Sequence, residues 1–172
     1  MGDLSAHFDR REFTCKCGCG RSNINPELIT KLEAIFAYLA RTPTGCNSIV
    51  ITSGIRCPSY SVKVGGYSSD AHTLSIAADI IVYKSDKTPY SPEAVAAVAE
   101  KVGFSGIGLM SGATHVDIRN NNNYVNSHWF GDERDGRNNI STFAEYLPKT
   151  ATADKHKLTV IYDGKTILEK EF

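Results

Sequence analysis

An aspartate stands inside a segment that otherwise has the character of a buried strand. Residues 77–83 read Ala-Ala-Asp-Ile-Ile-Val-Tyr, and His72 lies seven residues before Asp79. An ionised carboxylate is costly to bury unless a positive charge offsets it, and a metal cation shared with His72 would do so. The simpler interpretation is that Asp79 merely begins the strand. The metal interpretation requires a fold in which a loop residue and a strand residue meet.

Two amphipathic helices are predicted from their start signals. Residues 25–27 read Asn-Pro-Glu, which combines a capping side chain, a proline in the first helical position and an acid in the first turn. Apolar residues then recur at helical spacing, which predicts a helix over residues 25–41. Residues 91–93 read Ser-Pro-Glu, and Gly103 is placed as the stop of this second core helix.

Polar residues also alternate with aliphatic ones near residue 117. Because side chains alternate across a strand, His115, Asp117 and Arg119 share one face while Val116 and Ile118 occupy the other. Three polar groups opposite two aliphatic ones indicate a site rather than a solvated edge. The strands that we expect cover residues 48–52, 77–83, 106–110 and 115–119.

This element order predicts an α+β fold with a small antiparallel sheet packed against two main helices. A chain of 172 residues suits one ordinary domain, which we place at residues 1–148. Residues 149–172 are then a linker and a C-terminal β-hairpin around Asp163-Gly164, a strong hairpin signal. A lone hairpin is marginally stable, so we expect it to dock on the domain or to pair with another chain.

Composition excludes several classes of partner. The formal net charge is zero and no basic face is interleaved with aromatics, so we expect no nucleic-acid partner. No apolar run approaches the roughly 18 residues of a membrane span, so we expect no membrane partner. The first residues lack the layout of a signal peptide, which predicts synthesis in a cytoplasm.

Cysteines are crowded near the N-terminus. The chain has five, an odd number that argues against a full disulfide framework. Cys15, Cys17 and Cys19 alternate with other residues, whereas zinc ligands are usually spaced more widely. Two interpretations stay open, a glycine-rich turn with ordinary thiols and a structural metal site in which Cys57 is the distant partner.

Four residues follow one another in a characteristic order: Arg56 after Ser53-Gly54, then His72, Asp79, and His115 after the Gly-Ile-Gly of residues 106–108. This order and spacing resemble the zinc D-alanyl-D-alanine carboxypeptidase family of peptidoglycan peptidases, which shares its fold with the metal-binding domain of hedgehog proteins. The resemblance covers roughly residues 8–129, including the cysteine loop, and does not reach the hairpin.

The resemblance implies that His72, Asp79 and His115 bind a catalytic zinc and leave its fourth position to water. Two nitrogens and one oxygen fit the three-ligand pattern of catalytic zinc. Arg56 matches the family arginine that contacts substrate, either at a terminal carboxylate or at the developing oxyanion. Ser53 and Trp129 are further candidates for substrate binding.

The general base departs from the family pattern. Many relatives place an acid or a histidine shortly before the last zinc histidine, where this chain has Gly-Ala-Thr at residues 112–114. Asp117 is our candidate for that role, as in the branch of the family that reads His-x-Asp. Two alternatives stay open, in which Asp117 is the third zinc ligand or orients His115.

The resemblance therefore predicts a zinc peptidase that cuts peptidoglycan stem peptides at or next to D-alanine, as a carboxypeptidase or an endopeptidase. The alternative is a zinc-holding wall-binding or docking module that has lost catalysis. Lack of a signal peptide favours a phage endolysin or a virion tail component, which reaches the wall after lysis or within the particle. In a virion, the hairpin would bind a partner chain or a second copy.

Overall fold

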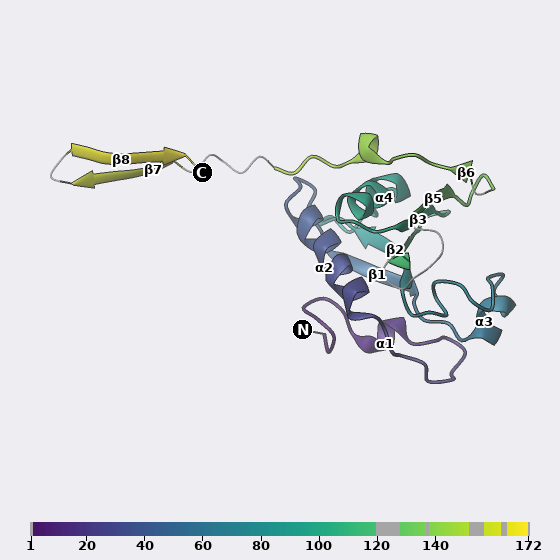
Figure 1. Ribbon diagram of the computed structural model, residues 1–172. Coiled ribbons are helices and arrows are strands. Elements are labelled where there is room, and N and C mark those ends of the chain that lie inside the picture. Colours follow the sequence, from purple (N-terminus) through teal and green to yellow (C-terminus); the bar gives the residue numbers. More distant parts are fainter. Residues whose placement is uncertain (1, 120–127, 137, 152–156, 163–164, 172) are drawn as a thin grey trace.

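The computed structural model describes residues 2–119, 128–136, 138–151, 157–162 and 165–171. Its main feature is a 6-stranded sheet in the order β1-β2-β4-β3-β5-β6, with helices lying against it (Figure 1). The strands are β1 (Ser48–Ser53), β2 (Ala77–Tyr83), β3 (Gly106–Leu109), β4 (Thr114–Asp117), β5 (Trp129–Asp132) and β6 (Asn138–Asn139). None of the helices in the described residues has the length and apolar character that a bilayer crossing requires.

Both predicted core helices are confirmed. In α2 (Pro26–Ala40), the Asn25 side chain accepts a hydrogen bond from the backbone N–H of Glu27, and in α4 (Pro92–Lys101), Ser91 caps in the same way. The other helical segments are α1 (Arg10–Phe13), α3 (Pro58–Lys63) and the 3-10 turn η2 (Ala144–Tyr146). Helix α3 was not predicted, because a proline after a strand indicates that the strand has ended, whereas Pro58 also opens this helix.

The α+β class is confirmed, but the sheet is mixed rather than wholly antiparallel. Strands β1, β2, β4 and β3 pair antiparallel as expected, whereas β5 pairs parallel with β3. Residues 129–132, Trp-Phe-Gly-Asp, are too few and too irregular in pattern to indicate a strand on their own. The parallel pairing with β3 therefore had no signal in the sequence.

The sheet has an apolar face and a polar one. Ala78, Ile80 and Val82 of β2 are fully buried in the core that also contains the apolar residues of α2 and α4. Asp79 lies between them in the strand, so its side chain points to the opposite face. His115 pairs directly with Asp79 across β2 and β4 and therefore shares that face. The fold thus places the candidate residues on the side of the sheet away from the core helices.

The C-terminal hairpin consists of β7 (Lys157–Tyr162) and β8 (Lys165–Glu171), which pair antiparallel as expected. Its turn at Asp163-Gly164 and residues 152–156 of the expected linker lie outside the described residues. The domain division at residue 148 and the docking of the hairpin on the domain or on another chain stay predictions.

Candidate active site

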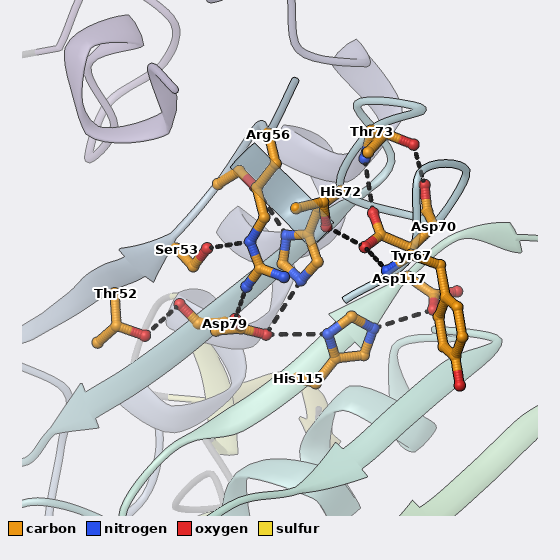
Figure 2. A network of polar contacts seen from close by, with 12 residues as sticks. Thr52, Ser53, Arg56, Tyr67, Asp70, His72, Thr73, Asp79, His115 and Asp117 are labelled. Carbon is orange, nitrogen blue, oxygen red and sulfur yellow. Dashed lines mark hydrogen bonds and ion pairs between the residues drawn. The ribbon is translucent and has the colours of Figure 1, made fainter. Parts of the chain in front are cut away.

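Three predicted ligands meet on the polar face of the sheet. Oδ1 of Asp79 lies 2.9 Å from Nδ1 of His115 and 3.3 Å from Nε2 of His72 (Figure 2). The three donor atoms lie within 4.8 Å of one another. His72 comes from the turn before β2, Asp79 from β2 itself and His115 from the neighbouring strand β4. The pair noticed in the sequence is therefore one part of a three-residue cluster.

His72 is held in one orientation by the backbone. Its Nδ1 lies 2.7 Å from the carbonyl oxygen of Gly54. Because a carbonyl oxygen only accepts, Nδ1 is the donor in this contact, and Nε2 is the ring nitrogen that faces Asp79. Gly54 in turn packs against the backbone of Phe13, where an added Cβ would lie 2.6 Å from the Phe13 Cα. The end of α1 thus supports the loop that orients His72.

Asp117 lies behind His115. One carboxylate oxygen is 3.0 Å from His115 Nε2, and Arg119 donates to the carboxylate from Nε, from Nη2 and from its backbone N–H. Asp117 is fully buried. His115, Asp117 and Arg119 interact on one face, as the strand pattern predicted. Of the three roles open for Asp117, this geometry favours the orientation of His115.

Positive charge stabilises the buried carboxylates. Although burial opposes ionisation, hydrogen bonds from His115 and His72 hold the pKa of Asp79 well below its ordinary range. Burial alone would lower the pKa of His115, but its hydrogen bonds to Asp117 and Asp79 raise that pKa to about 10. A cation is therefore favoured at this point, and two imidazoles with one carboxylate fit zinc.

Arg56 is fixed beside this cluster. Its Nη2 lies 2.9 Å from Oδ2 of Asp79, and its Nε donates to the Ser53 hydroxyl at 3.0 Å (Figure 2). A register shift in β1 after Ile51 places Ser53 opposite Asp79. Ser53, a predicted substrate-binding residue, thus supports Arg56.

The cluster opens into a cleft of about 450 Å³. Predicted site residues in its wall include Arg56, His72, Asp79, His115 and Trp129. The described lining residues include neither Asp117 nor Ser53. The ring of Trp129 stands edge-on to His115, at 6.1 Å between centroids, and closes one side. This volume lies in the range of ligand-binding sites.

Sequence reasoning missed a carboxylate in this cleft, Glu133, which follows β5. Its backbone N–H donates to the Leu109 carbonyl at 2.9 Å, and its side chain passes over Gly108, where an added Cβ would lie 3.3 Å from Oε1. Gly108 pairs with His115 in the sheet. The next residue, Arg134, pairs with Asp132 and Glu93, and its hydrogen bonds hold the pKa of Asp132 below its ordinary value. Glu133 thus lies at the end of β5, where these contacts of Arg134 and of the Glu133 backbone hold the chain in place.

Gly106 makes room for the Asp117 carboxylate, since an added Cβ would lie 2.1 Å from Oδ2. Gly106→Ala is therefore expected to lower the free energy of unfolding by about 1–3 kcal/mol through overpacking. It should also weaken zinc retention, because Asp117 would move away from His115. Denaturant unfolding and metal analysis measure the two effects, with Ser111→Ala in the turn between β3 and β4 as the control. Equal stability of the two variants would contradict the tight contact.

The four cysteines Cys15, Cys17, Cys19 and Cys57 also come together, in a second cluster. A family model described as Peptidase M15 matches residues 6–119, which include this cluster and the residues from Arg56 to Asp117. Trp129 and Glu133 lie outside the match. No curated protein and no solved structure matches the chain significantly.

Proposed function

Because the chain belongs to the Peptidase M15 family of zinc peptidases of the D-alanyl-D-alanine carboxypeptidase type, we propose that it hydrolyses peptidoglycan stem peptides at or next to D-alanine. The observation that carries this proposal is the convergence of His72, Asp79 and His115 at the base of a cleft beside Arg56. The family supports a metallopeptidase in general. The stem-peptide substrate is the finer step that we propose here.

The zinc would be held by one imidazole nitrogen from each of His72 and His115 and by one carboxylate oxygen of Asp79. Bound there, zinc would polarise a scissile carbonyl and would lower the pKa of a water molecule to about 7. Gly54 orients His72, and Asp117 orients His115 by accepting from its Nε2, so both imidazoles are fixed before any ligand arrives.

Arg56 is placed to bind the substrate. Its contacts with Asp79 and Ser53 engage Nη2 and Nε and fix the guanidinium plane at the cleft wall. A guanidinium has five N–H groups, so the N–H groups that do not bind Asp79 or Ser53 can donate to a terminal carboxylate or to the oxyanion that forms at the scissile bond. A carboxypeptidase would use the first contact and an endopeptidase the second.

We assign the general base to Glu133. It is exposed, lines the cleft and belongs to the segment beside β3, whereas Asp117 is buried and bonded to Arg119 and His115. A base must reach the proton that it removes, which favours the cleft carboxylate. Glu133 would take a proton from water and return it to the leaving amine.

The experiment combines metal analysis with mass spectrometry of a digested muropeptide panel. We expect release of D-alanine or of shorter stem peptides, loss of this cleavage on chelation and its recovery when zinc is restored. The product masses distinguish the carboxypeptidase from the endopeptidase. Zinc-loaded protein that leaves every muropeptide intact would contradict the proposal.

The alternative of a catalytically inactive wall-binding module rests on the missing acid before His115. Glu133 supplies a carboxylate to the cleft from the turn after β5, so this absence does not favour the module. Zinc-loaded protein that binds peptidoglycan and cleaves none of the panel would be the result expected of the module.

A further inference from the structure

Four cysteine sulfurs converge in a second cluster, which is separate from the cluster of His72, Asp79 and His115. Cys15, Cys17 and Cys19 lie on the loop after α1, and Cys57 directly precedes α3. The four Sγ atoms lie within 4.8 Å of one another, with 3.3 Å between Cys15 and Cys17 and 3.5 Å between Cys17 and Cys57. All are free thiols.

These separations suit a shared metal ion. Zinc–sulfur bonds are about 2.3 Å long, so the sulfurs of a tetrahedral site lie about 3.8 Å apart. The observed separations are close to that value, whereas a disulfide requires about 2.05 Å. Four thiolates in a tetrahedral arrangement select zinc over the hard cations that oxygen ligands prefer.

The loop is shaped to gather the sulfurs. Gly18 and Gly20 have φ angles of 83° and 79°, the left-handed region that glycine adopts without steric cost. The Cys15 N–H donates to the Arg21 carbonyl at 2.9 Å and closes the loop. The Cys57 N–H donates to the Cys15 sulfur at 3.3 Å, a contact that stabilises a thiolate.

We propose that Cys15, Cys17, Cys19 and Cys57 form a structural zinc site that fastens the N-terminal loop to the wall of the cleft. Cys57 adjoins Arg56, the Ile55 N–H donates to the Phe13 carbonyl at 2.8 Å, and Lys16 donates to the Thr52 carbonyl. The site would close a loop of about 40 residues, and cross-links of this length stabilise by restricting the unfolded chain. Zinc here holds the segment that carries Arg56 and the Gly54 carbonyl.

Zinc content per chain tests this inference. Protein purified under reducing conditions is expected to hold about two zinc ions per chain, one for each cluster. The Cys17→Ser/Cys19→Ser variant should lose the cysteine-bound ion, His115→Ala should lose the other, and the control Cys46→Ser should keep both. Unchanged zinc in the cysteine variant, or two disulfides among these cysteines in protein kept under reducing conditions, would overturn the inference.

X-ray absorption spectroscopy of the His115→Ala variant identifies the atoms bound to zinc. It tests the inference even if the cysteine variant fails to fold, because His115→Ala retains all five cysteines. We expect a shell of sulfur neighbours at about 2.3 Å from zinc. A shell of nitrogen and oxygen neighbours, or no bound zinc, would overturn the proposal. The inference does not depend on peptidase activity: sulfur-bound zinc in a chain that cleaves no muropeptide would support it and contradict the proposed function.

Discussion

Glu133→Gln is expected to lower kcat by about 10²–10⁴-fold, the range that general base catalysis contributes. The amide keeps the size of the side chain and its place over Gly108 but cannot take a proton. Cleft zinc should change little, because Glu133 is not among the three clustered ligands, and KM should change little, because the amide fills the same space. Steady-state kinetics on a defined stem peptide, with metal analysis, measure these quantities.

A pH profile separates a base from a merely structural residue. The low-pH limb of kcat/KM reports the group that must lose its proton, so this limb should disappear or move in Glu133→Gln. Glu145→Gln is the matched control, because Glu145 is exposed on η2 and does not line the cleft. Wild-type kcat in Glu133→Gln would remove Glu133 from the mechanism.

The parts of the fold that the sequence predicted are those whose own residues carry a signal, such as a helix cap or a pattern of apolar residues. Capping side chains at Asn25 and Ser91, each followed by a proline, identified both core helices. The strand that contains Asp79 followed from its run of apolar residues, and the strand that contains His115 followed from side-chain alternation. Strand β5 carries no such signal, since its four residues are held by pairing with β3. Long-range pairing is a property of the whole sheet, which a local pattern does not encode.

The same distinction applies to the site. His72 and Asp79 are seven residues apart, and the cost of burying a carboxylate made them visible in the sequence. Their meeting with His115 needs only the antiparallel pairing of β2 and β4, which the predicted strands allow. Glu133 reaches the cleft through β5, so nothing near residue 133 distinguishes it from an ordinary surface acid. The role of Asp117 depended on its burial, which alternation alone does not give.

Asp117→Asn is expected to weaken zinc binding in the cleft by about 10–100-fold, the usual effect of removing the partner that orients a ligating histidine. The free energy of unfolding should fall by about 3–5 kcal/mol, because the largely buried Arg119 would then face a neutral amide. Zinc titration followed by activity, and denaturant unfolding of the metal-free chain, measure these effects. High zinc should restore most of kcat, since a positioning residue acts through metal occupancy.

The chain offers a matched control for that variant. Asp132 binds Arg134 with the same spacing and the same contacts, from Nε at 2.9 Å, from Nη2 at 2.7 Å and from the backbone N–H at 3.0 Å. The Arg134 side chain is 35% exposed, against 11% for that of Arg119. Asp132→Asn should therefore lower stability much less than Asp117→Asn and leave zinc affinity unchanged. If Asp117→Asn instead kept its zinc affinity and lost kcat even at saturating zinc, Asp117 would be the base and the assignment of Glu133 would fall.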